Sequence, residues 1–101
     1  MEHTQSSYKL PNIPHGTIEG ESILHITKAT DIATGVISEI HGWFKLLNDS
    51  KQSSSKHHRI GAPAIMTPDG VELWYVDDVY YIPTAHEKMM WELRKKNEAA
   101  T

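Results

Sequence analysis

Two chain reversals within residues 62 to 82 constrain the fold more than any other feature of the sequence. The first is Thr67-Pro68-Asp69-Gly70, where proline presets one turn dihedral and glycine supplies the positive φ that closes the turn. The second falls at Asp77-Asp78. Short runs rich in apolar and β-branched residues flank both reversals: Ala62 to Met66, Val71 to Val76 and Val79 to Ile82. This alternation predicts an antiparallel β-meander.

Two further elements are expected on either side of the meander. Ser22 to Thr27 is short and rich in aliphatic and β-branched residues, which is typical of a strand. Thr84-Ala85-His86-Glu87 has the S/T-x-x-E spacing of a capping box and predicts the start of a C-terminal helix. On that helix the stripe Met89, Met90 and Leu93 is expected to dock, while Trp91 lies off it and stays partly exposed.

Residues 31 to 47 fit two templates. On the helical period most of their large apolar side chains fall on one stripe, whereas a strand would divide them between two faces. Gly35 and Gly42 oppose the helix, because each costs about 1 kcal/mol relative to alanine. The sorting of side chains favours a helix with Thr30 or Asp31 as its N-cap, and a strand from residue 36 is the alternative. The stripe consists of Ala33, Val36, Ile37, Ile40, Trp43, Phe44 and Leu47.

These elements predict a single small α+β domain, in which an antiparallel meander packs with one internal helix and a C-terminal helix. The 101 residues, 39% of them hydrophobic, leave room for only one modest core. We expect residues 1 to 16 to form a flexible N-terminal arm, residues 17 to 97 the globular domain, and residues 98 to 101 a frayed end. Residues 48 to 56 are polar and serine-rich and predict a loop.

Charge and composition exclude several classes of protein. A formal net charge of -3 gives no basic field for sequence-independent binding to nucleic acid, so nucleic acid is not an expected partner. Cysteine is absent, which excludes disulfides and thiolate metal sites. The first 16 residues lack the basic start and apolar run of a secretory signal, and no stretch has the roughly 20 apolar residues of a membrane span.

Residues 57 to 82 carry a pattern with several residues at fixed spacing. His58-Arg59-Ile60-Gly61-Ala62-Pro63-Ala64 is followed by Asp69-Gly70, Trp74-Tyr75-Val76-Asp77 and Tyr81. The pattern resembles the β repeat H-R-x-x-G-P-A, D-G, W-W/Y-V-N/D-G of uncharacterised accessory proteins of tailed bacteriophages. The resemblance implies a protein made in the cytoplasm of an infected host, often acting on a host enzyme or defence component, and it carries no catalytic residue.

This chain departs from the repeat at two places. Ala62 stands where the family usually has glycine, and Asp77-Asp78 stands where it has Asn-Gly or Asp-Gly. Without that glycine we expect a wider second reversal than the family's. A degenerate preceding copy starting at Trp43-Phe44 would make residues 36 to 47 a strand.

Two sets of residues are candidates for binding. Aromatic side chains and methionine bury much area at small entropic cost, which predicts a protein-binding face built from the meander and the last helix. A local cluster of basic residues predicts an anion-binding patch that could grip a nucleotide. The first set is Trp74, Tyr80, Tyr81, Met90 and Trp91, and the second is Lys56, His57, His58 and Arg59.

The sequence contains no constellation of catalytic residues that we recognise. Its seven histidines lack the helical-turn spacing of a metal site, and Ser53-Ser54-Ser55 near His57 lies in a polar run rather than on a supported turn. We therefore assign no catalytic residue, metal ligand or cofactor. The working hypothesis is a non-enzymatic accessory protein that binds and inhibits a host protein. The alternatives are a binder of a small anionic ligand and a minor virion or assembly protein, and a homodimer is allowed.

Overall fold

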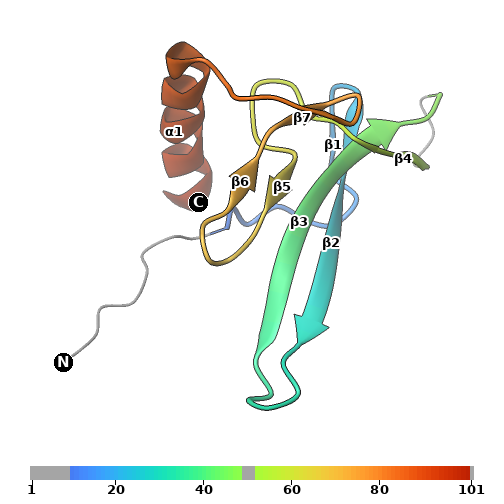
Figure 1. Ribbon diagram of the computed structural model, residues 1–101, viewed down its shortest axis with the longest axis vertical. Helices are drawn as coiled ribbons and strands as arrows, with labels where there is room; N and C mark the ends of the chain where they lie inside the picture. The colour runs from blue at the N-terminus through green and yellow to red at the C-terminus, as the bar shows by residue number, and fades with distance from the viewer. Residues whose placement is uncertain (1–9, 49–51, 101) are drawn as a thin grey trace.

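The computed structural model describes residues 10–48 and 52–100, which form one small α+β domain (Figure 1). The predicted fold class is confirmed. The main antiparallel sheet has the strand order β1-β2-β3-β5-β6 with β4 also paired to β3, and β7 and β8 form a separate pair. The elements are β1 (Ile18–Glu19), β2 (Ser22–Thr30), β3 (Ile37–Leu46), β4 (Ser53–His57), β5 (Ile65–Met66), β6 (Glu72–Leu73), β7 (Tyr75–Val76), β8 (Val79–Tyr80) and α1 (Ala85–Ala100).

The long β2–β3 hairpin replaces the internal helix, so the helix prediction for residues 31 to 47 is wrong. β3 pairs with β2 in an unbroken register from Ser22 opposite Lys45 to Thr30 opposite Ile37. The residues expected to cap a helix close the hairpin instead. Asp31 accepts the Ala33 N–H through its side chain at 2.9 Å, and Gly35 has a φ of +74°, which a right-handed helix does not allow.

The outer part of this hairpin, residues 27 to 40, extends away from the body of the domain as a two-stranded ribbon (Figure 1). We call it the outer ribbon. Every residue from 27 to 37 is exposed, including Ile32 at 98% and Val36 at 58%. The tip therefore presents apolar side chains to solvent.

The meander is present, but it is divided between two sheets. β5 and β6 form the first predicted hairpin, closed by Gly70 with a φ of +96° and a bond from its N–H to the Thr67 carbonyl at 3.1 Å. Trp74 interrupts the ladder between β6 and β7. Its ring is only 4% exposed, so at this point the chain leaves the main sheet while burying a large side chain.

The second reversal is tight, so the prediction of a wider turn is wrong. Val76 pairs with Val79, which leaves Asp77 and Asp78 as a two-residue turn with φ values of +50° and +67°. Aspartate adopts this left-handed conformation more readily than most residues. Hydrogen bonds also hold the turn, because the Asp78 N–H donates to the His57 carbonyl at 2.8 Å.

The other predicted elements are the strand from Ser22, the C-terminal helix and the serine-rich loop, and they are only partly confirmed. The strand at Ser22 to Thr27 is confirmed within β2. The capping box is confirmed by reciprocal bonds of 2.9 and 3.1 Å between Thr84 and Glu87, and α1 continues beyond Asn97 to Ala100. The predicted loop is wrong at residues 53 to 56, which belong to β4, while residues 49 to 51 lie outside the described part.

The segment preceding β1 packs against the domain from residue 10 onward. Leu10 and Ile13 contact the two hydrophobic clusters, and His15 Nδ1 accepts the Ile26 N–H at 3.0 Å. The prediction of a free arm is therefore wrong for residues 10 to 16, and residues 1 to 9 lie outside the described part. One cluster contains Ala62, Met66, Trp74 and Trp91, and the other contains Leu24, Trp43 and Ala64.

Candidate functional site

Arg59 is part of the core and does not face solution. Its side chain is buried, and its guanidinium carbon lies 4.1 Å from the centre of the Trp43 ring and 5.3 Å from the centre of the Trp91 ring. Its Nε and Nη2 donate to the two carboxylate oxygens of Glu19 at 3.1 and 3.0 Å. The prediction that Arg59 binds an external anion is wrong, because its guanidinium is already committed to an internal carboxylate.

The Glu19 carboxylate also contacts a second arginine, which belongs to the helix. Arg94 Nη2 also contacts the Glu19 carboxylate, so this one side chain links β1, the segment after β4, and α1. Burial opposes ionisation of Glu19, but the hydrogen bonds and positive charges of Arg59 and Arg94 outweigh it and lower the pKa of the carboxyl. The cluster therefore remains ionised and holds the helix to the sheet.

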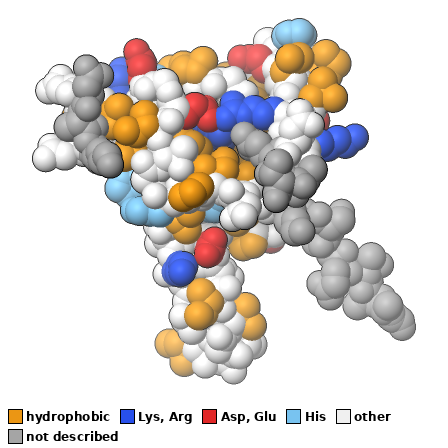
Figure 2. Space-filling view, turned by 180° about the vertical axis from the view of Figure 1, so that it is seen from behind, with side chains coloured by type: hydrophobic (Ala, Val, Ile, Leu, Met, Phe, Trp, Pro, Cys, Tyr) orange, Lys and Arg blue, Asp and Glu red, His pale blue; other side chains and the backbone are white. Residues whose placement is uncertain are grey.

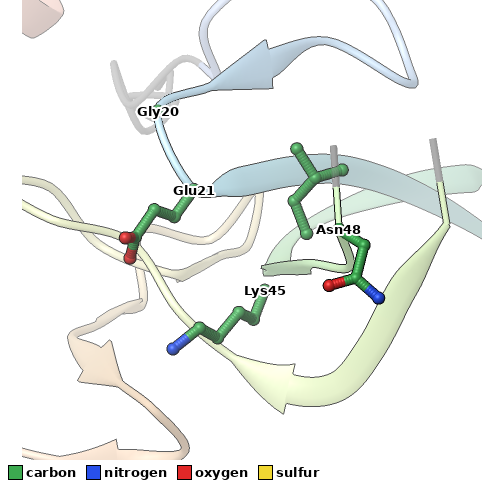
Figure 3. Close-up of a pocket in the computed structure, with 5 residues that line it drawn as sticks. Gly20, Glu21, Lys45 and Asn48 are labelled. Carbon is green, nitrogen blue, oxygen red and sulfur yellow. The ribbon is translucent and has the colours of Figure 1, made fainter. Parts of the chain in front are cut away.

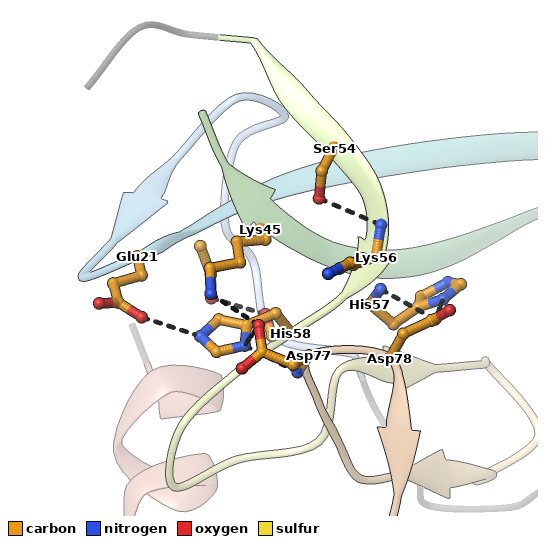
Figure 4. A network of polar contacts seen from close by, with 9 residues as sticks. Glu21, Lys45, Ser54, Lys56, His57, His58, Asp77 and Asp78 are labelled. Carbon is orange, nitrogen blue, oxygen red and sulfur yellow. Dashed lines mark hydrogen bonds and ion pairs between the residues drawn. The ribbon is translucent and has the colours of Figure 1, made fainter. Parts of the chain in front are cut away.

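His58 is the buried centre of a second polar network (Figure 4). The Asp77 N–H donates to His58 Nδ1 at 3.0 Å, so the ring hydrogen lies on Nε2, which faces Glu21 Oε1 at 3.2 Å. Ser22 Oγ donates to the His58 carbonyl at 2.6 Å. The His58 ring is 2% exposed. His58 therefore fixes the β7–β8 turn to the start of β2, and its predicted role in an anion patch is wrong.

Lys45 completes this network at the surface. Its Nζ lies 2.6 Å from Asp77 Oδ1, and this hydrogen bond raises the pKa of Lys45 and lowers that of Asp77. Both groups are exposed enough for salt to screen their attraction. Lys45 therefore lies near the predicted patch, but its ammonium group is already paired with Asp77 of the same chain.

Only Lys56 and His57 of the predicted anion-binding set remain accessible. Lys56 is exposed, while His57 is half-buried with Nδ1 3.6 Å from Asp78 Oδ1. Figure 4 shows both beside the aspartates of the turn. Acidic neighbours reduce the attraction for an anion. Anion binding by Lys56 and His57 therefore stays a prediction with little electrostatic support.

His57 belongs instead to a continuous row of rings that sequence reasoning missed. The row crosses β2, β3, β4, β7 and β8, with successive centroids 4.5 to 5.6 Å apart. Histidine side chains gather at the surface just above the outer ribbon in Figure 2. The residues are far apart in sequence, so only the strand pairing could have revealed the row. Its members are His15, His25, Phe44, His57, Tyr75 and Tyr80.

One histidine of the row also lies close to a serine, because Ser53 Oγ is 3.0 Å from His25 Nε2. A nucleophilic serine also needs a group to orient the histidine and donors to stabilise an oxyanion. Neither accompanies this pair among the contacts of the described residues. The geometry accordingly gives Ser53 a structural contact and no catalytic role.

The five predicted protein-contact residues do not form one face. Trp74 and Trp91 are buried in one hydrophobic cluster, and Tyr81 packs partly exposed against it. Tyr80 and Met90 are exposed, at 54% and 49%, but they lie on the β7–β8 hairpin and on α1, which are separated across the domain (Figure 1). The prediction that Trp91 is exposed is wrong, and a shared contact face is not assembled.

The helix docks through the side opposite to the one predicted. Trp91 is 1% exposed and its Nε1 donates to Glu72 Oε2 at 3.1 Å, and Lys95 Nζ lies 2.9 Å from the same oxygen. Burial opposes the charge of Lys95, yet hydrogen bonds to Glu72 and Glu92 raise its pKa. The surface under the helix therefore presents carboxylates. The helix packs on it with the side that carries basic residues and the Trp91 ring. Met89, Met90 and Leu93 remain outside.

A shallow cleft borders the His58 network (Figure 3). Its volume is about 210 Å³, which is below the roughly 300 to 1,000 Å³ of typical small-molecule sites. The carboxylate and the ammonium group on its walls contact His58 and Asp77. It offers no strong anchor to a ligand. Its lining residues are Gly20, Glu21, Lys45, Leu46 and Asn48.

No family model, curated protein or solved structure matches the chain. Within residues 10–48 and 52–100, no group of three or more histidines and carboxylates is placed to hold a metal ion. In the same residues, no helix is both long and apolar enough to cross a membrane. The local geometry is therefore the basis for any functional assignment.

Proposed function

We propose that the protein is a phage-encoded accessory protein that binds one host protein stoichiometrically and inhibits a host defence or metabolic enzyme. The resemblance of residues 57 to 82 to phage accessory proteins motivates the host partner. The observation that carries the binding role is the apolar side of α1 that faces solvent. We call Met89, Met90 and Leu93 the outer helix face.

The outer helix face has the geometry of a docking surface. Met89, Met90 and Leu93 are each about half exposed, at 53%, 49% and 54%, and their spacing places them together on one side of the helix. Exposed hydrophobic side chains are visible in Figure 2 where the helix lies. Methionine adapts to irregular partner surfaces, and an apolar helix face commonly binds in a groove of a partner.

A small anionic ligand is less well supported as the target. Two of the four residues expected to hold it, His58 and Arg59, are buried and paired with carboxylates of the same chain. The cleft beside them is small and carries both charges. A partner protein that covers the outer helix face accounts for more of the exposed apolar surface.

The test is affinity capture of the tagged protein from infected host cells, followed by mass spectrometry. The variant Met89→Ala/Met90→Ala/Leu93→Ala removes the face while keeping good helix formers. Lys88→Ala, at an exposed position on another side of the same helix, is the matched control. We expect one dominant host protein with the wild type and the control, and its loss with the triple variant.

Stoichiometry separates an inhibitor from an enzyme. Inhibition of the captured enzyme should be complete at a fixed molar ratio and should not increase with incubation time. Turnover at a small fraction of that ratio would contradict the proposal, and so would capture of the same host protein by the triple variant.

A further inference from the structure

The outer ribbon has two open edges. β3 pairs with β5 at His41 and Gly42 and with β4 at Phe44 and Leu46, but within the described residues no strand pairs with Ile37 to Ile40 on the side away from β2. An isolated two-stranded ribbon is marginally stable in water. An open strand edge is also a template for pairing with another chain.

The register identifies the backbone groups that face outward. Leu24 exchanges bonds of 2.8 and 2.9 Å with Gly16 and Thr17 beyond β2, and the Trp43 N–H donates to Ala64 beyond β3. Because outward-facing residues alternate along an antiparallel strand, the same side is taken by Lys28 and Thr30 on β2, and by Ile37 and Glu39 on β3.

The two edges differ in how well they are protected. Lys28 lies on the β2 edge, where a lysine discourages pairing. The segment from His15 to Thr17 covers that edge nearer the body, through bonds to Leu24 and Ile26. The β3 edge carries neither lysine nor proline between residues 36 and 40. It is the edge left available for a strand.

We propose that two copies of the chain pair through this edge, with the β3 strands antiparallel about a twofold axis at Ser38. The sequence of the edge is complementary to itself in this register. Ile37 faces Glu39 of the second copy and exchanges two backbone hydrogen bonds with it, and the symmetric pair adds two more. On the other face Val36 meets Ile40, which buries two apolar pairs. The contact is isologous and closes at a dimer.

The charges favour a second copy over an unrelated strand. Lys28 lies directly opposite Glu39 within each ribbon, so each copy brings its own counter-charge to the joined sheet. Glu39 then has Lys28 on one side and an apolar Ile37 on the other, and no like charges are placed directly opposite. The dimer edge is independent of the outer helix face, so either proposal can fail alone.

Proline substitution tests which edge is used. Glu39→Pro removes an outward N–H of β3, and Lys28→Pro, directly opposite in the same ribbon, removes the matching N–H of β2. Because the dimer loses two hydrogen bonds by symmetry, we expect Glu39→Pro to weaken dimerisation at least about tenfold in analytical ultracentrifugation. Lys28→Pro should leave it unchanged. A monomeric wild type, or equal effects of the two prolines, would overturn the proposal.

Cysteine substitution tests the register without disturbing the backbone. The chain has no cysteine, so Ser38→Cys introduces a single thiol at the twofold axis. A non-hydrogen-bonded antiparallel pair has Cα atoms about 4.5 Å apart, which suits a disulfide. Mild oxidation should give a covalent dimer with Ser38→Cys and none with Ala29→Cys, the residue opposite Ser38 in the ribbon. The reverse result would place the contact on β2 and contradict the proposal.

Discussion

The guanidinium carbon of Arg59 lies 4.1 Å from the centre of the Trp43 ring. Trp43 belongs to one hydrophobic cluster, and Trp91, whose ring centre lies 5.3 Å from the same guanidinium carbon, belongs to the other. A buried cation therefore joins the two apolar parts of the core. Its charge is balanced by Glu19, so the domain depends on an ion pair where most small domains use aliphatic side chains.

Removing Arg59 should leave Glu19 as a partly buried charge without the partner that bonds both of its carboxylate oxygens. We expect Arg59→Met to lower the free energy of unfolding by about 3–5 kcal/mol, measured by urea denaturation. Arg94→Met is the control, because Arg94 contacts the same carboxylate but its side chain is 37% exposed. It should cost about 1 kcal/mol or less. Similar losses for the two variants would show that Arg59 has no special role.

The docking side of α1 gives a second prediction. Trp91 fills one hydrophobic cluster and Met90 faces solvent. Trp91→Ala should therefore lower the free energy of unfolding by about 3–5 kcal/mol, whereas Met90→Ala should change it by less than about 0.5 kcal/mol. Chemical denaturation followed by far-UV circular dichroism measures both. A larger loss for Met90→Ala would mean that the helix docks through the outer helix face.

The sequence predicted the elements whose signals are local. The Pro-Asp-Gly turn and the Thr84–Glu87 capping box depend on residues within four positions of one another, and both are present. Residues 31 to 47 were mispredicted because the strand depends on its pairing with Ser22–Thr30. That non-local register overrides a helical pattern of apolar residues.

The candidate sites were harder to predict than the fold. A run of Lys56, His57, His58 and Arg59 carries no sign of where its partners lie. The carboxylates that contact His58 and Arg59 are Glu21 and Glu19, 37 and 40 residues earlier. Arg94 and Lys95 likewise pair with Glu19 and Glu72, 75 and 23 residues earlier, which explains why the helix turns a charged side inward. Two members of this basic run, His58 and Arg59, therefore belong to the buried interior and not to a binding surface.

Acid should weaken the fold in two separate ranges of pH. Burial lowers the pKa of His41 from its ordinary 6.5, with Arg59 also lowering it and Glu39 opposing. The unfolded chain then binds the proton more readily, so the stability due to neutral His41 is present above pH 6.5 and is lost as the pH falls through the folded pKa. Glu19, whose pKa lies below its ordinary 4.5, contributes stability above that pH and loses it in more acidic solution.

Urea unfolding between pH 3 and pH 8 separates the two groups. His41→Gln should flatten the upper part of the profile and leave the acidic part, because Glu19 is unchanged. Glu19→Gln should do the opposite while also lowering stability at neutral pH, since it removes the charge that balances Arg59. A His41→Gln profile with the same slope as the wild type between pH 5 and 7 would assign that slope to other histidines.

The Asp77-Asp78 turn contains two non-glycine residues at positive φ, and this predicts a stabilising substitution. Glycine adopts such a conformation without steric cost, and Asp78 offers in exchange only a 3.3 Å hydrogen bond and a 3.6 Å contact to His57. Asp78→Gly should therefore raise the Tm by a few degrees. Asp77→Gly should gain less, because it loses the 2.6 Å bond to Lys45, and the difference should shrink in high salt. Thermal unfolding at low and high ionic strength measures both, and a lower Tm for Asp78→Gly would show that its contacts with His57 outweigh the backbone strain.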